Sequence, residues 1–215
     1  MLAAVAITLS ACSKPDPLVG TVLTAGDPAA GFELRNQFGQ QVSLEDYSQD
    51  VVVLTFLYTA CPDICPVVAN HLADIHRLLG EDADDVGIVV ISVDPERDTV
   101  QTAHAYSEKW GMLDDWAYLV GDREQLAPVW EAYFVEPFVD DVSHSTTTAA
   151  TDTTAATATS RGVDAFLQDT VERYTIVHSA PVYLIDRQRV MRVLFTLPLY
   201  PEEVVHDIRL LLKPT

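Results

Sequence analysis

Two long runs of apolar residues form the framework of the chain, and a shorter third run follows them. Val51–Tyr58 and Gly87–Val93 are rich in β-branched residues and lack the alternation of a half-exposed strand. Each run therefore predicts a β-strand that is covered on both faces. Trp116–Val120 has the same apolar character, and we expect a third strand there.

A helix is predicted after each of these runs. Pro66 suits the first position of the first helix, because the N–H that proline lacks has no partner there anyway. The positions that recur at helical spacing in this helix are Val67, Val68, His71, Leu72, Ile75, Leu78 and Leu79. Asp98 or Thr99 can cap a second helix from about Val100 to Lys109, and Asp122 can cap a third.

Hairpins are predicted on either side of these units. Near the N-terminus, Phe32–Leu34 and Val42–Leu44 flank a segment that ends in a glycine, Asn36–Gly39. Near the C-terminus, Val182–Asp186 and Val190–Phe195 are separated by a short polar turn. This arrangement favours an antiparallel pair of strands that closes the sheet.

Three segments depart from this alternation. Residues 1–12 have the size of a signal-peptide core and end in a lipobox-like motif, in which Cys12 would become the lipidated first residue. The alternative is an unprocessed apolar N-terminus, since no basic residues precede this stretch. Residues 13–31 are rich in Pro, Gly and small residues and predict a tether. Residues 139–162 are rich in Thr and Ala and predict a disordered insertion, because they lack the apolar surface that offsets ordering entropy.

Residues 32–213 are therefore expected to form one domain around the remaining elements. Their order is strand, cysteine motif, helix, strand, helix, hairpin and helix, which is the order of a thioredoxin-like fold. We expect an α/β three-layer architecture with a mixed central sheet flanked by helices and an N-terminal β-hairpin. In that fold the loop before the closing hairpin packs against the cysteine pair, often through a cis-proline. Pro181 is the candidate for this cis bond, and His178 precedes it on the same loop.

Two cysteines, Cys61 and Cys65, lie where the first buried strand ends and its helix begins. Cys65 is expected at or near the N-cap, where the dipole and the unsatisfied N–H groups of the helix start favour a thiolate, so a lowered pKa is expected for Cys65. Pro62 and Pro66 restrict the backbone and make the turn rigid. The Cys-x-x-x-Cys spacing is one residue longer than the redox motif of thioredoxin-like proteins. A lowered pKa suits metal binding and disulfide exchange alike, whereas the extra residue is a first hint that electron exchange is not the main task.

The charge of the chain restricts its partners. It has 32 acidic against 13 basic residues, a formal net charge of −19. Nucleic acids are excluded as partners, because their phosphates would be repelled. Basic partners and cations are favoured.

Three motifs in order after the lipobox, Cys61–Pro66, Ser92–Thr99 and Val177–Ser179, resemble the Sco/SenC family of copper-binding assembly factors for cytochrome c oxidase. The similarity covers the chain from about Val19 to Lys213 and departs from the family at the Thr/Ala insertion. The resemblance implies a metallochaperone that is a lipoprotein in the cell envelope, anchored to the outer face of the cytoplasmic membrane. Its implied partners are another copper carrier and the copper-bearing subunit of the oxidase, whose dinuclear copper centre it helps to assemble.

The resemblance further implies that Cys61, Cys65 and His178 bind copper. Two thiolates and an imidazole select Cu(I) and can hold Cu(II) when a further weak ligand joins. Oxidation of Cys61 and Cys65 to a disulfide would release the metal, so redox state would control loading.

Other interpretations of the same residues stay open. The chain can be a membrane-anchored thiol–disulfide oxidoreductase, in which Cys61 attacks the substrate disulfide and Cys65 resolves the intermediate. Under this interpretation alone the protein is an enzyme. His178 discriminates between the two functions, because disulfide exchange needs no third ligand. The cysteines can also form a structural disulfide, and His178 can be an ordinary strand-end histidine. The segment 94–99 is either a turn and helix cap, with an Arg97–Asp98 ion pair, or a part that shapes the site.

Overall fold

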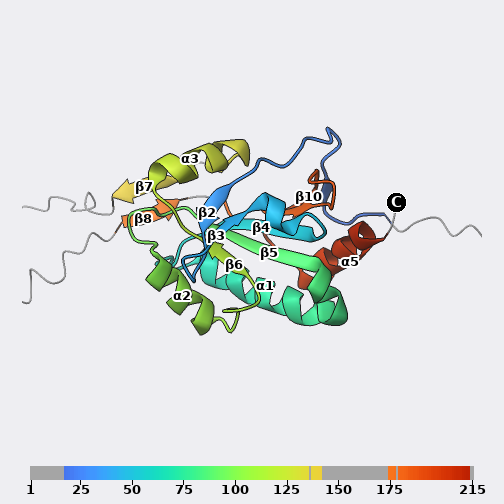
Figure 1. Ribbon diagram of the computed structural model, residues 1–215, viewed down its shortest axis with the longest axis horizontal. Helices are drawn as coiled ribbons and strands as arrows, with labels where there is room; N and C mark the ends of the chain where they lie inside the picture. The colour runs from blue at the N-terminus through green and yellow to red at the C-terminus, as the bar shows by residue number, and fades with distance from the viewer. Residues whose placement is uncertain (1–16, 136, 142–173, 178, 214–215) are drawn as a thin grey trace, which may run out of the picture.

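The computed structural model describes residues 17–135, 137–141, 174–177 and 179–213, and Figure 1 shows the arrangement of the elements. In chain order these are β1 (Thr21–Val22), β2 (Glu33–Arg35), β3 (Gln41–Ser43), a 3-10 helix (Leu44–Tyr47), β4 (Val51–Leu57), α1 (Ile64–Leu79), a second 3-10 helix (Gly80–Asp85), β5 (Val86–Ser92), α2 (Val100–Lys109), β6 (Ala117–Leu119), α3 (Arg123–Ala132), β7 (Phe138–Asp141), β8 (Tyr174–Val177), β9 (Val182–Ile185), β10 (Met191–Phe195) and α5 (Pro201–Leu212). The predicted strands, helices and both hairpins are all present.

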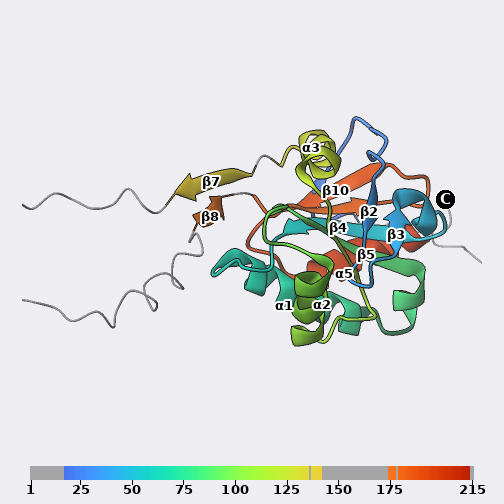
Figure 2. The ribbon, with the colours of Figure 1, turned by 60° about the vertical axis from the view of Figure 1, so that its left-hand side comes forward.

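A mixed sheet in the order β1-β10-β9-β4-β5-β6 forms the middle layer. β4, β5 and β6 are parallel to one another, whereas β9 is antiparallel to β4 and begins the hairpin with β10. Helices α1, α2 and α5 lie on one face of this sheet and α3 lies on the other (Figure 2). The predicted three-layer thioredoxin-like architecture is therefore confirmed.

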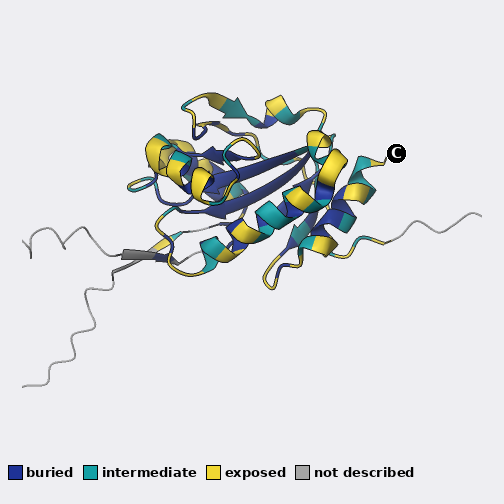
Figure 3. Ribbon diagram, turned by 90° about the horizontal axis from the view of Figure 1, so that it is seen from below, coloured by how far each residue is buried: buried dark blue, intermediate teal, exposed yellow. Residues whose placement is uncertain are grey.

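The centre of the sheet is covered on both faces, as the unbroken apolar runs predict. Every residue of β4 is buried, and so is every residue of β5 after Val86. Figure 3 shows the central strands as buried and the helices with exposed outer faces. Burial of this kind is what makes the ends of β4 and β5 a rigid base for the loops that follow them.

The predicted caps are confirmed at two helices, and one helix starts earlier than predicted. Thr99 and Asp122 each accept a hydrogen bond from the third amide of α2 and α3. Helix α1 begins at Ile64 after the N-cap residue Asp63, so Pro66 occupies its third position. The prediction of Pro66 at the first position is wrong by two residues. Proline is tolerated at either place, because none of the first amides of a helix has an intrahelical acceptor.

Part of the predicted tether belongs to the fold. β1 pairs with the outer strand β10, and Pro28 bridges to Val190. The amides of Val19 and Gly20 donate to the carboxylate of Asp207 on α5, at distances of 2.8 to 3.0 Å. The segment from residue 17 onward is therefore packed on the domain, because its backbone groups find partners on the sheet edge and on α5.

Two further expectations differ from the structure. The predicted insertion begins at Val139, but Phe138–Asp141 form β7, which pairs with β8; residues 142–173 lie outside the described residues. The described residues have their cis peptide bond at Leu197–Pro198, so the cis bond predicted at Pro181 is wrong. The carbonyl oxygen of Pro181 accepts a hydrogen bond from Thr55 Oγ1 at 2.8 Å. This contact anchors the segment before β9 to β4 whatever the isomer of the proline.

Within the described residues, no helix is both long enough and apolar enough to cross a bilayer. Cys12, the predicted lipidation site, lies outside those residues.

Candidate metal centre

The two cysteines of the predicted site lie together at the carboxyl end of β4. Cys61 follows the strand, and Cys65 lies in the first turn of α1. The Cys65 amide donates to Cys61 Sγ at 3.4 Å. Cys65 is fully buried, whereas 9% of Cys61 is exposed. Neither forms a disulfide, so the pair is in the reduced state from which either copper binding or disulfide formation starts.

The two thiols differ in acidity. Hydrogen bonding with the Cys65 thiol lowers the pKa of Cys61 to about 5, against the opposing effect of burial, and the backbone amides of Cys65 and Asp63 add to the lowering. The pKa of Cys65 is raised, first by the same hydrogen bond to Cys61 and then by burial. At neutral pH Cys61 is therefore a thiolate that accepts a hydrogen bond from the protonated Cys65. The lowered pKa expected for Cys65 at the helix start is therefore wrong: the acidic thiol is Cys61, which precedes the helix, because Cys65 is buried and hydrogen-bonded to it.

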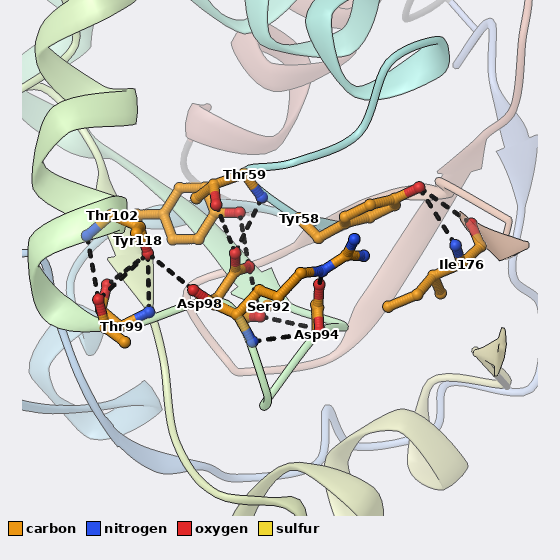
Figure 4. Close-up of polar contacts among 10 residues, drawn as sticks. Tyr58, Thr59, Ser92, Asp94, Asp98, Thr99, Thr102, Tyr118 and Ile176 are labelled. Atoms are coloured by element: carbon orange, nitrogen blue, oxygen red, sulfur yellow. Dashed lines mark hydrogen bonds and ion pairs between the residues drawn. The ribbon is translucent and has the colours of Figure 1, made fainter. Parts of the chain in front are cut away.

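Tyr58, the residue after β4, connects the cysteine turn to β8. Its hydroxyl donates to the Ile176 carbonyl oxygen at 3.4 Å and accepts from the Ile176 amide at 3.3 Å (Figure 4). Its single proton is shared between two acceptors, the Ile176 carbonyl oxygen and the Cys61 sulfur, and the hydrogen bond to the sulfur helps to lower the pKa of Cys61. Burial raises the pKa of Tyr58, so the hydroxyl keeps the proton that it donates.

The carboxylate of Asp98 joins three elements beneath the same turn. It accepts hydrogen bonds from the Thr59 amide at 3.0 Å and the Thr59 hydroxyl at 2.6 Å. The Ser92 hydroxyl at the end of β5 donates at 2.6 Å, and the Tyr118 hydroxyl on β6 at 3.3 Å (Figure 4). Burial raises the pKa of Asp98, and these hydrogen bonds oppose that rise. The network fixes Thr59, two residues before Cys61.

The segment 94–99 contributes more than a turn and a cap. The predicted ion pair between Arg97 and Asp98 is wrong: Arg97 pairs with Asp94, because Asp98 turns inward to the Thr59 and Ser92 donors. The Arg97 guanidinium lies over the Tyr58 ring, 5.4 Å from its centroid. Of the two interpretations of this segment, the structure supports the one in which it shapes the site.

The structure brings Cys61 and Cys65 together, whereas His178 lies outside the described residues. Within the described residues, no group of three or more His, Cys, Asp or Glu side chains could hold a metal ion. His71 and His76 lie on α1, His104 on α2 and His206 on α5. Asp63 is an exposed N-cap residue. Two thiols with a split in acidity are donors suited to a soft metal ion.

Sequence reasoning missed the roles of Tyr58 and Asp98. The signal was present, because a tyrosine that directly follows a buried strand and a carboxylate between two buried strands both need partners. Their partners lie 118 residues away for Tyr58 and 39 residues away for Asp98, so local patterns did not reveal them.

Comparison with known proteins gives a consistent result. The family model of SCO1/SenC matches residues 23–162. The SCO1 protein homolog of Bacillus subtilis is 34% identical over 91 residues, which are 42% of this chain and 47% of that protein. The mitochondrial SCO1 homolog 1 of Arabidopsis thaliana is 36% identical over 115 residues, 52% of this chain and 34% of that protein. The matched segments thus span about half and about a third of these two relatives.

Among solved structures, ScoI of Bradyrhizobium japonicum with copper bound is similar at a TM-score of 0.65 and 29% sequence identity. The alignment covers 86% of this chain and 99% of that one. The likeness therefore extends over the whole of the solved domain, beyond the cysteine motif.

Proposed function

Because the chain belongs to the SCO1/SenC family, we propose that it is a copper metallochaperone that holds its cargo through Cys61, Cys65 and His178. Its recipient is the copper-bearing subunit of cytochrome c oxidase, whose dinuclear copper centre it helps to assemble. The observation that carries this proposal is the thiol pair at the end of β4, with one thiolate ready to bind at neutral pH. A similar protein, ScoI of Bradyrhizobium japonicum, has been solved with copper bound.

The surroundings of residue 178 support its role as third ligand. Ile176, two residues before it, is hydrogen-bonded to Tyr58, which lies three residues before Cys61. The carbonyl oxygen of Pro181, three residues after it, accepts a hydrogen bond from Thr55 on β4, the strand that Tyr58 follows. Both flanks are therefore tied to the strand that ends at the cysteines. An imidazole completes a donor set that selects Cu(I) and can hold Cu(II).

The N-terminus supports a location in the cell envelope. We propose that Cys12 carries a lipid that anchors the protein to the outer face of the cytoplasmic membrane, where it receives copper from another carrier. Residues 13–16 then separate the anchor from Pro17, the first described residue. Mass spectrometry of the mature N-terminus tests this proposal, and a chain that still carries residues 1–11 would contradict it.

A titration of the reduced protein with copper tests the metal site. We expect one tightly bound equivalent, with thiolate-to-Cu(II) absorption, for the wild type. His178→Ala should weaken binding by more than about 100-fold, because loss of a ligand exceeds the 10- to 100-fold cost of losing an outer-shell partner. His206→Ala is the matched control, since this histidine on α5 contacts the Pro17 carbonyl instead of the site. Equal copper affinity in His178→Ala and the wild type would overturn the ligand assignment.

The acidity of Cys61 also supports a second function, thiol–disulfide exchange on exported proteins. A thiolate at Cys61 can attack a substrate disulfide, and Cys65 can then close the intramolecular disulfide and release the reduced product. Two electrons pass to the substrate, and the Cys61–Cys65 pair is oxidised. His178→Ala should leave reduction of a model disulfide almost unchanged. A wild type that binds no copper tightly but exchanges disulfides would make this the main function.

A further inference from the structure

We propose that Tyr58 is a positioning residue of the copper site, whose hydroxyl fixes strand β8 to the cysteine turn and so sets the approach of the third ligand. The inference rests on the proposed copper site. It assigns a function to a side chain that binds no metal itself.

Strand β8 depends on Tyr58 because it stands apart from the central sheet. Within the described residues β8 pairs with β7 alone, in a two-stranded ribbon. Ile176 connects it to the core: the side chain is buried, and its backbone N–H and C=O both hydrogen-bond to the Tyr58 hydroxyl. One side-chain atom thus satisfies both backbone groups of a residue through which the ribbon contacts the domain.

The Tyr58 ring is itself held in place. It is almost completely buried, and the guanidinium of Arg97 lies over it. Arg97 is in turn fixed by its ion pair with the buried carboxylate of Asp94, which follows β5. A cation over an aromatic face is attracted by the ring quadrupole, so the ring plane is defined as well as its position. The hydroxyl therefore presents one fixed point to β8.

The same hydroxyl lies beside the sulfur of Cys61. Tyr58 thus reaches both the first thiol and the strand two residues before His178. A ligand set drawn from two distant segments binds tightly only if the segments are held in register before the metal arrives, because ordering them on binding reduces the affinity. The geometry gives Tyr58 this function.

Replacement of Tyr58 by Phe removes the hydroxyl and keeps the ring. The matched control is Tyr133→Phe, which also removes a buried hydroxyl bonded to a backbone carbonyl, that of Ala30 at 2.8 Å. In the reduced, metal-free protein we expect amide hydrogen exchange at Ile176 to accelerate by about 10-fold in Tyr58→Phe, the loss of roughly one hydrogen bond. Tyr133→Phe should leave Ile176 exchange unchanged.

The second measurement is copper release to a chelator, followed together with the thiolate-to-Cu(II) absorption. Tyr58→Phe should release copper about 10-fold faster with a shifted absorption band, and Tyr133→Phe should match the wild type. Faster exchange at Ile176 with unaltered copper release and spectrum would overturn the positioning role. Unaltered exchange at Ile176 would also overturn it. Failure of the proposed copper site is a separate outcome. In that case the wild type would bind no copper, whereas Tyr58→Phe would still show faster amide hydrogen exchange at Ile176 than the wild type.

Discussion

Two buried aspartates, Asp98 and Asp207, each join segments that are distant in the sequence. Asp98 lies beneath the cysteine turn, whereas Asp207 lies on α5 and holds the N-terminal segment. Each carboxylate accepts hydrogen bonds from backbone amides of a segment distant in sequence. Among the described residues, Asp207 receives the amides of Val19 and Gly20 and so fastens the N-terminal segment to α5. Asp98 receives an amide and three hydroxyls from the ends of β4 and β5 and from β6. The same chemistry secures a sheet edge in one place and the base of the cysteine turn in the other.

The two aspartates differ in the segment that each one holds: Asp207 holds the N-terminal segment at Gly20, and Asp98 holds the turn at Thr59. Gly20 lies so close to β10 that a Cβ there would approach Val193 Cγ1 to 2.4 Å, so its segment completes the edge of the sheet. Thr59 precedes Cys61 by two residues, so a shift at Asp98 is transmitted to the thiol pair. We therefore expect Asp98 to affect both stability and copper binding, and Asp207 to affect stability alone.

The largest effect is expected for Asp98→Ala. The variant leaves the buried hydroxyls of Ser92 and Tyr118 and the half-buried donors of Thr59 without their acceptor, which should lower the free energy of unfolding by about 3 kcal/mol or more. Copper affinity of the folded fraction should fall as well, since the turn before Cys61 is released. Denaturant unfolding and copper titration measure the two effects. Asp98→Asn, which keeps an acceptor oxygen, should lose less of both.

Asp207→Ala should have a smaller effect of about 2 kcal/mol on unfolding, since its partners are two backbone amides close to solvent. Hydrogen exchange at Val19 and Gly20 should accelerate. Copper affinity should stay within about twofold of the wild type, because Asp207 and its partners Val19 and Gly20 are not part of the proposed copper site. A large loss of copper affinity would contradict the division between the two aspartates.

The smallest effect is a pH dependence expected for Asp98. Burial raises the pKa of Asp98 above the ordinary value of an aspartate, so the folded state binds the proton more tightly than the unfolded state. Its contribution to stability is therefore complete below the unfolded pKa and is lost as the pH rises through the raised pKa. The free energy of unfolding of the wild type, measured relative to Asp98→Asn, should fall as the pH rises through the raised pKa of Asp98. A rise in that difference would show that the hydrogen bonds outweigh burial.

Much of the fold followed from local patterns. The apolar runs predicted β4 and β5 because a strand buried on both faces needs no alternation, and Thr99 and Asp122 predicted the starts of α2 and α3 because a cap acts within its own helical turn. The pair Cys61 and Cys65 was found in the same way, from its place between a strand and a helix.

Other features depended on contacts that no local pattern contains. Residues 17–31 were predicted as part of a tether because they lack periodicity. The amides of Val19 and Gly20 nevertheless donate to Asp207, which is 188 residues from Val19 in the sequence. The cis bond expected at Pro181 came from analogy within the fold class, and that segment is held by Thr55 instead.

The sequence by itself determined the layers of this protein, the position of its thiols and the family to which its motifs point, because hydrophobic burial, helix capping and cysteine spacing act over a few residues. Only the tertiary structure decided which thiol is acidic, where Asp98 and Arg97 point, and that Tyr58 joins Ile176 to the cysteine turn. Those features depend on the distance between groups far apart in the chain, and folding alone brings such groups within hydrogen-bonding reach.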